Sequence, residues 1–237
     1  MLTFLAYLVL GIFLVGFVRR ILIYARVPAP LKIPTTPAPT TRFGVFCRLL
    51  GEVTLFTSLF KSDKLAWAGG IAFHAGMLVV LIRHVRYFCD PLPAWFAHIE
   101  IFGILAGLVM AGGLAFLFLR RLVFERVRHI SSKADYLFLV LLLAIAGSGL
   151  MMDFVLRPNI VTIKASMSGL LTAFGALPPV KAPGDVVFLL HLAFVGILMV
   201  IFPFSKLMHA GGIFFSPTRN QVDNPRERRH VNPWAEQ

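Results

Sequence analysis

The chain has 237 residues, of which 58% are hydrophobic and 14% are charged, and its formal net charge is +12 at pH 7. A soluble domain is about half apolar and about a quarter charged, so this composition excludes an ordinary soluble domain and is typical of an integral membrane protein. The basic residues sit at the ends of apolar runs, as the positive-inside rule predicts, so the charge does not indicate a nucleic-acid partner. Cys47 and Cys89 fall on opposite sides of the second apolar run and predict neither a disulfide nor an iron–sulfur site.

Five apolar runs approach the length of about 20 residues that a bilayer span needs. We therefore predict an all-α integral membrane protein with five transmembrane helices. They cover residues 1–18, 65–85, 99–119, 136–156 and 186–204. No positive charge precedes the first run, so it predicts an uncleaved helix rather than a secretory signal peptide.

The connections differ in composition. Residues 26–42 are proline-rich and predict an extended linker, because proline removes backbone donors and disfavours helix. Residues 43–64 mix Phe, Leu and Val with charged residues; this pattern fits an amphipathic helix at the membrane interface or a surface helix packed on a partner. Residues 160–177 have room for a short helix lying over the bundle.

Glycine, serine or proline residues stand out in three of the spans. The third contains Gly103, Gly107, Gly112 and Gly113, which allow either close helix packing in lipid or room for a flat macrocycle. A Gly147-Ser148-Gly149 interruption lies in the fourth span, and Pro203 lies near the end of the fifth.

Lys and Arg are distributed unevenly among the connections. The loop 19–64 holds eight, the loop 120–135 five and the tail 205–237 five, whereas the loops 83–98 and 153–185 hold two and three. This asymmetry predicts that the N-terminus lies outside and that the tail is cytoplasmic.

Four histidines lie on or next to two of the spans. His74 and His84 belong to the second, and His191 and His209 to the fifth and its end. Ionisable residues in a membrane core are costly and usually functional, and imidazole is a common metal and haem ligand. Because the two spans run antiparallel in this topology, His74 lies level with His209 and His84 with His191. The pattern predicts two bis-histidine haem sites, one near each membrane face.

The spacings of the two pairs differ. His74 and His84 are 10 residues apart, a rise of about 15 Å, whereas His191 and His209 are 18 apart, which on a straight helix is five whole turns and about 27 Å. Helix tilt, distortion at Pro203, and ligands that approach opposite faces of each macrocycle must absorb this difference. Three other histidines are predicted to be ordinary surface residues: His98, His129 and His230.

With these residues the chain resembles the gamma-subunit family of respiratory nitrate reductase, whose ligand pairs are also 10 and 18 residues apart. The resemblance covers residues 1–212 and implies a di-haem cytochrome b domain, a four-helix haem bundle plus one helix. It implies that His74 and His209 hold the haem b nearer the cytoplasm and that His84 and His191 hold the haem b nearer the outer face.

The tail 213–237 is similar to that of the DsrM subunits of DsrMKJOP complexes. That resemblance implies electron exchange between quinone (menaquinone or ubiquinone) and a cytoplasmic iron–sulfur partner like DsrK, related to heterodisulfide reductase, in dissimilatory sulfur metabolism. It also implies further membrane or periplasmic subunits. The tail, too polar to span a bilayer and basic near Trp234, predicts a docking segment for the partner, or a segment touching anionic lipid.

A quinone next to the outer haem needs a hydrogen-bond donor and a proton acceptor. Residues of the two outer loops that suit this role are Arg83, Asp90, His98, Glu100, Asp153 and Lys164. Arg83 is the strongest candidate because it adjoins His84. Alternatively, Arg83 and Arg86 pair with haem propionates, since arginine forks suit carboxylates.

Other readings of the chain make different predictions. A zinc enzyme would favour an H-E-x-x-H helix motif, which the sequence lacks. A cofactor-free anchor would need no histidines at matched depths. Di-haem subunits of nitrate reductase, formate dehydrogenase or hydrogenase complexes share the chemistry and differ in partner. No nucleophile or acid–base pair stands out, so we expect an electron-transfer subunit rather than a complete enzyme.

Overall fold

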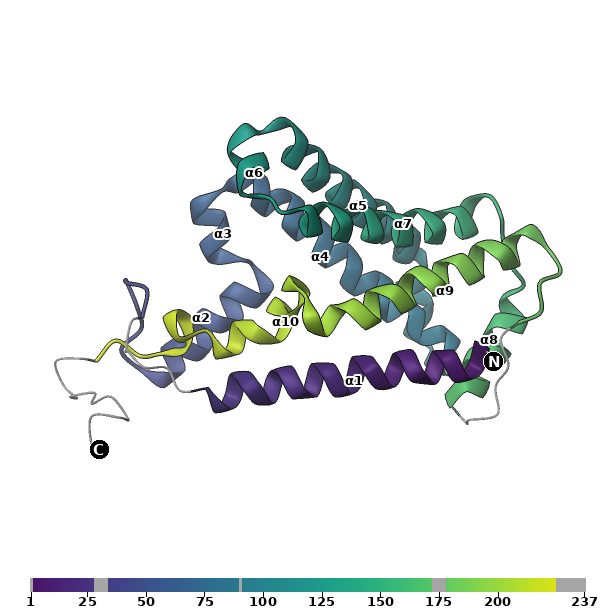
Figure 1. Ribbon diagram of the computed structural model, residues 1–237, viewed down its shortest axis with the longest axis horizontal. Coiled ribbons are helices and arrows are strands. Elements are labelled where there is room, and N and C mark those ends of the chain that lie inside the picture. The colour runs from purple at the N-terminus through teal and green to yellow at the C-terminus, as the bar shows by residue number, and fades with distance from the viewer. Residues whose placement is uncertain (1, 28–33, 90, 172–177, 225–237) are drawn as a thin grey trace. The chain divides into compact units, whose positions relative to one another are not determined.

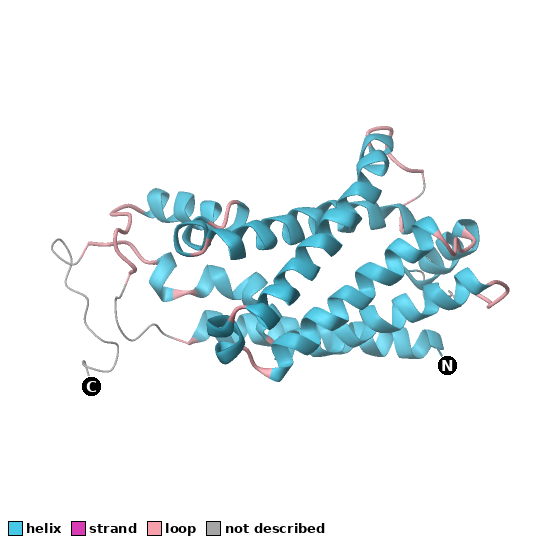
Figure 2. Ribbon diagram, turned by 90° about the horizontal axis from the view of Figure 1, so that it is seen from above, coloured by secondary structure: helices cyan, strands magenta, loops and turns pink. Residues whose placement is uncertain are grey.

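The structure is a computed structural model that describes residues 2–27, 34–89, 91–171 and 178–224, apart from the side chains of Leu2, Thr3, Ala97, Glu100, Ile101 and Leu171. All regular secondary structure in these described ranges is helical (Figure 2). Five of the helices are long and apolar enough to cross a membrane, in agreement with the predicted number of spans. They are α1 (Leu2–Arg26), α4 (Lys64–His84), α5 (Phe96–Val123), α7 (Lys133–Phe154) and α9 (Pro183–Ile201).

These helices expose much of their apolar surface within the single chain. Large exposed side chains include Val15, Leu78 and Phe102, which are 69%, 59% and 61% exposed. A soluble monomer rarely shows apolar patches of this extent, whereas a bilayer solvates them. The chain is therefore a multi-pass membrane protein.

The described chain divides into two compact units, which are treated separately below. The first contains Met1–Val9 and Asp63–Leu198, and the second contains Leu10–Ser62 and Met199–Gln237.

In the first unit, α5 packs between α4 and α7 (Figure 1). Met110, Leu114 and Ala146 form the buried centre of this packing. Gly76 and Gly113 lie where α4 and α5 approach most closely. A Cβ on Gly76 would lie 2.7 Å from the Ala106 carbonyl oxygen, and a Cβ on Gly113 would lie 2.7 Å from the Phe73 backbone nitrogen. Gly113 therefore serves close helix packing, one of the two predicted roles for these glycines.

The other three glycines of α5 have different surroundings. A Cβ on Gly103 would collide with the Arg83 side chain, and one on Gly107 would lie 3.2 Å from Leu150. A Cβ on Gly112 would meet nothing within 4 Å. Gly112 therefore does not take part in the close contact.

A short helix covers one end of the first unit. α8 (Ile160–Leu171) contacts the 3-10 turn η1 (Val85–Tyr87) that ends α4. Its Ile163 and Met167 are buried with Phe188 of α9. The short helix expected within residues 160–177 is thus present, and residues 172–177 lie outside the described part of the chain.

In the second unit, residues 43–62 do not form one continuous helix. They form α2 (Arg42–Thr54) and α3 (Thr57–Ser62), separated by Phe56, whose φ of 50° lies in the left-handed region. A bulky residue in that region cannot continue a right-handed helix, so the chain turns there.

The linker and the start of the tail pack together in this unit. The Thr35 backbone nitrogen donates to the Thr218 carbonyl oxygen at 2.8 Å, and that of Asp223 donates to the Pro39 carbonyl oxygen at 2.8 Å. The tail helix α11 (Pro217–Asn220) contacts α2. The tail up to residue 224 therefore has partners within its own chain, and residues 225–237 with Trp234 lie outside the described ranges.

The fifth span is not one straight helix through to His209. α9 ends at Ile201 and is followed by the 3-10 turns η2 (Phe202–Phe204) and η3 (Lys206–Met208), with α10 (His209–Gly212) after them. The spacing of five whole turns for a straight helix therefore does not apply between His191 and His209, and the distortion named at Pro203 is present: Pro203 lacks a backbone donor, and Ser205 is extended with φ −120° and ψ 174°.

Candidate functional site

The first unit brings two of the four predicted histidines together. His84, the last residue of α4, and His191 of α9 have ring centroids 6.3 Å apart and ring planes inclined by only 13°. Imidazole nitrogens bind transition metals at about 2.0–2.1 Å, so two imidazoles on opposite sides of one metal place their ring centroids about 6 Å apart. The observed separation therefore fits one metal ion between the two rings.

The hydrogen bond of each ring determines which of its two nitrogens keeps a lone pair for a metal. His84 Nδ1 lies 2.7 Å from the Val80 carbonyl oxygen, one turn earlier in α4. A carbonyl oxygen only accepts, so Nδ1 carries the proton and Nε2 has the lone pair that a metal requires. Such a bond fixes the ring orientation and raises the basicity of the ligand.

His191 is held in the same tautomer by a side chain of another helix. Its Nδ1 lies 2.9 Å from Ser148 Oγ of α7. Ser148 Oγ also lies 2.7 Å from the Ala144 carbonyl oxygen and 3.0 Å from that of Ile145, and either carbonyl can accept its one hydrogen. With the hydrogen on one of these carbonyls, Ser148 accepts the bond from His191 Nδ1–H, and His191 Nε2 is left for a ligand.

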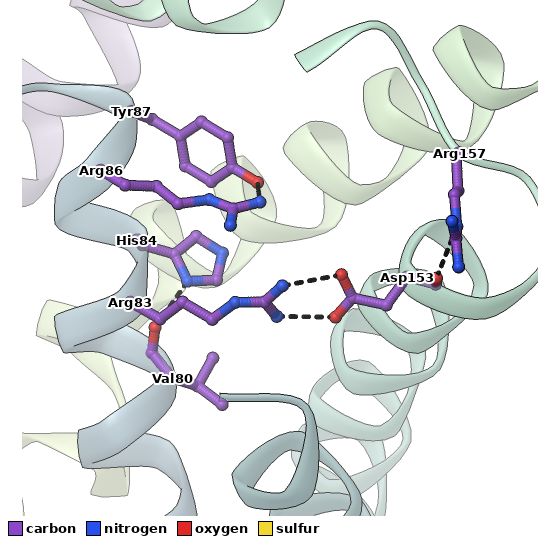
Figure 3. A network of polar contacts seen from close by, with 7 residues as sticks. All are labelled: Val80, Arg83, His84, Arg86, Tyr87, Asp153 and Arg157. Atoms are coloured by element: carbon purple, nitrogen blue, oxygen red, sulfur yellow. Dashed lines mark hydrogen bonds and ion pairs between the residues drawn. The ribbon is translucent and has the colours of Figure 1, made fainter. Parts of the chain in front are cut away.

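An ion pair joins α4 to α7 beside His84, as Figure 3 shows. Arg83 donates from its two terminal nitrogens to the two carboxylate oxygens of Asp153, at 2.7 Å and 3.0 Å. The backbone of Asp153 also accepts a bond from Arg157 Nε at 3.1 Å. The bidentate geometry fixes both side chains, so the Arg83 guanidinium is engaged by a carboxylate of the chain itself.

Arg86 and Tyr87 lie on the other side of His84. Arg86 donates to the Tyr87 hydroxyl at 3.1 Å, and its guanidinium lies 5.0 Å from the centre of the Tyr87 ring. The Tyr87 ring meets the His84 ring edge to face, with centroids 5.8 Å apart. His84 is thus flanked by a guanidinium and a phenol that pack against each other (Figure 3).

The other two predicted ligands belong to different units, so each is described within its own. His74 of α4 is half-buried, and its Nδ1 lies 2.8 Å from the Gly70 carbonyl oxygen. His209, at the start of α10, is exposed, and its Nδ1 lies 2.9 Å from the Lys206 carbonyl oxygen. Both rings thus carry the Nδ1 proton, as His84 and His191 do, and their pairing stays a prediction.

The remaining quinone candidates have few described contacts. His98 is exposed near the start of α5, and Lys164 is half-buried on α8. Glu100 lies within α5, but its side chain is outside the described residues, as is Asp90 as a whole. Of these candidates, the described residues place Arg83 and Asp153 beside His84.

The number of protein side chains at the site distinguishes a zinc site from a haem site. Among the described residues, no three His, Cys, Asp or Glu side chains form a group that could hold a metal ion. A protein zinc site uses three or four such ligands, whereas haem iron needs only one or two axial ligands from the protein. The two Nε2 atoms of His84 and His191 therefore fit haem iron.

Sequence reasoning did not assign a role to Ser148. The available signal was its hydroxyl inside an apolar span, where a polar group needs a partner. The identity of that partner required the structure, because Ser148 and His191 are 43 residues apart.

Comparisons with known proteins agree on one family. The family model described as nitrate reductase gamma subunit matches residues 50–225. A protein of Archaeoglobus fulgidus is 37% identical over 96% of this chain and 81% of its own length. One of Archaeoglobus profundus is 33% identical over 97% of this chain and 81% of its own length. Both are named Hdr-like menaquinol oxidoreductase cytochrome b-like subunit.

Proposed function

The chain belongs to the nitrate reductase gamma subunit family, and from this premise we propose that it is a membrane cytochrome b subunit. In this proposal it exchanges electrons between the quinone pool and a cytoplasmic iron–sulfur partner through two b haems. The observation that carries the proposal is the His84–His191 pair, whose ring centroids are 6.3 Å apart and whose Nδ1 atoms are both hydrogen-bonded within the protein. Haem b, when bound, supplies an iron that cycles between ferric and ferrous by one electron.

The second haem of the proposal uses His74 and His209. Each ring donates its Nδ1 proton to a carbonyl oxygen in its own segment, at 2.8 Å and 2.9 Å. Both histidines are therefore held in the tautomer that suits ligation through Nε2. The spacing of 10 residues between His74 and His84 supports two sites along one helix, about 15 Å apart in rise.

The distribution of Lys and Arg supports an orientation. Eighteen of the 23 lie in residues 19–64, 120–135 and 205–237, which the positive-inside rule assigns to the cytoplasm. His84 and His191 then lie toward the outer face, and His209 and the tail lie toward the cytoplasm.

We place the quinone site near the outer haem, at the end of the first unit that α8 covers. Arg83, Asp153, Arg86 and Tyr87 bring a hydrogen-bond donor, a carboxylate and a phenol to the surroundings of His84. The guanidinium of Arg83 orients the Asp153 carboxylate, which is 25% exposed and thus accessible to a proton from a quinol. The word menaquinol in the names of both relatives supports menaquinone.

The partner is inferred from the tail resemblance and from the names of the relatives. A heterodisulfide reductase-like iron–sulfur protein of the DsrK type fits the words Hdr-like in those names, and a role in dissimilatory sulfur metabolism follows from the same resemblance. The second unit offers a cytoplasmic surface for it, because the exposed side chains of Phe43, Phe46 and Leu50 lie along α2.

The proposal is tested on the complex purified from its native membrane. Menadiol, a soluble menaquinol analogue, is mixed with the oxidised complex, and haem reduction is followed optically. We expect two b haems to be reduced in the natural protein, and we expect His84→Ala or His191→Ala to lose one haem and to slow reduction of the other. Unchanged reduction of the remaining haem in either variant would rule out entry of electrons at the His84–His191 site.

A further inference from the structure

Ser148 and Gly149 of α7 lie next to His191 of α9, one of the two proposed ligands of the outer haem. Ser148 Oγ lies 2.9 Å from His191 Nδ1, and it also lies 2.7 Å and 3.0 Å from the Ala144 and Ile145 carbonyl oxygens, either of which can accept its hydrogen. A Cβ on Gly149 would lie 3.6 Å from His191 Cε1, so the imidazole rests close to the α7 backbone.

His191 differs in this respect from the other three histidines. The Nδ1 atoms of His74, His84 and His209 bond to carbonyl oxygens within four residues of themselves. Those bonds fix a ring relative to its own segment only. The bond from His191 to Ser148 fixes the ring relative to a neighbouring helix, so it also fixes where the ligand lies within the first unit.

α7 contributes none of the predicted ligands, yet it is tied to both helices that do. Asp153 holds Arg83, the neighbour of His84 on α4, and Ser148 holds His191 on α9. α7 therefore tethers α4 beside His84 and fixes the His191 ring directly.

We propose that Ser148 is the positioning residue of the outer haem: its hydroxyl holds His191 in the Nδ1–H tautomer, at the place and with the basicity that axial ligation requires. This inference rests on the proposed function. A hydrogen bond from Nδ1–H to an acceptor adds electron density to the imidazole ring, and a more basic ligand favours the ferric state. The bond therefore lowers the reduction potential of the haem that His191 holds.

The test compares variants of the full chain, purified in its complex, by redox titration of the b haems and by haem release. We expect Ser148→Ala to raise the potential of one haem, to leave the other unchanged, and to weaken retention of the affected haem by about 10- to 100-fold. Ser148→Thr keeps the hydroxyl, so its haem potential and haem retention should match those of the natural protein. Gly147→Ala is the matched control, because its added methyl group would meet nothing within 4 Å.

The outcomes separate this inference from the proposed function. A natural protein without b haem would overturn the proposed function, whatever the variants do. Two haems in the natural protein, with unchanged potentials and retention in Ser148→Ala, would overturn the role of Ser148 alone. Equal shifts in the Ala and Thr variants would also overturn it, because they would assign the effect to packing. If Ser148→Ala does not accumulate, Ser148→Cys, which offers only a weak acceptor, must show the same direction of shift for the inference to stand.

Discussion

Breaking the Arg83–Asp153 ion pair should destabilise the first unit by more than an exposed pair would. The two side chains are 14% and 25% exposed, so each lone charge would be left largely buried. Removing one partner of a fully buried pair costs about 3–5 kcal/mol of stability, whereas an exposed pair contributes about 0.2–1 kcal/mol. Because this pair is only partly buried, we expect Arg83→Gln or Asp153→Asn to lower the free energy of unfolding by about 2 kcal/mol, between these ranges. That corresponds to a factor of about 30 in the ratio of folded to unfolded protein.

The double variant Arg83→Gln/Asp153→Asn tests the reasoning. It leaves no unpaired charge, so it should be about 1 kcal/mol more stable than the less stable single variant. Stability is measured by SDS titration of the purified protein, with loss of helical circular dichroism as the signal. Strictly additive losses in the double variant would refute the argument from an unpaired buried charge.

The ion pair between Asp63 and Arg120 provides the matched control. It also joins α4 to another helix, and its side chains are 36% and 15% exposed. Asp63→Ala should lower stability in the same assay, because Asp63 also accepts the Ala66 backbone N–H at 2.9 Å as the N-cap of α4. Only variants of the Arg83–Asp153 pair should change the spectrum of the haem held by His84 and His191.

Two further predictions concern packing and pH. Gly113→Ala should cost about 1–3 kcal/mol in the same SDS titration because its Cβ would lie 2.7 Å from a backbone nitrogen, whereas Gly112→Ala, which meets nothing within 4 Å, should not destabilise. Burial raises the pKa of Glu52, but hydrogen bonds from Ser58 and Thr57 together with the charge of Arg219 outweigh it, so the pKa lies below its ordinary value of 4.5. The stabilisation by Glu52 is thus present above the unfolded pKa and is lost as pH falls through the lower folded value. The melting temperature of Glu52→Gln should fall below that of the natural protein at pH 7, with a smaller difference below pH 4; a constant difference would contradict this.

The long elements could be predicted from the sequence because a bilayer imposes strict requirements on them. Continuous apolar runs flanked by Arg19, Arg83, Arg120 and Arg157 leave little alternative to spanning helices. The proximity of His84 and His191 could also be predicted, since antiparallel spans bring these two residues to the same depth.

The breaks and the supporting contacts could not be predicted in the same way. The left-handed Phe56 has no glycine or proline to signal it, and the consequence of Pro203 for His209 depends on the turns that follow it. The partners of Ser148 and Asp153 lie on other helices, and helix rotation about the axis decides which side chains meet. Hydropathy does not determine that rotation in helices that are apolar on every side.

The most direct test of the central claim is a reduced-minus-oxidised optical spectrum of the protein purified from its native membrane, combined with a haem count per chain. Two b haems per chain with sharp low-spin bands are predicted, and His84→Ala and His191→Ala should each remove the same one of the two. Absence of haem from the natural protein, or loss of different haems in these two variants, would contradict the assignment of His84 and His191 to one iron.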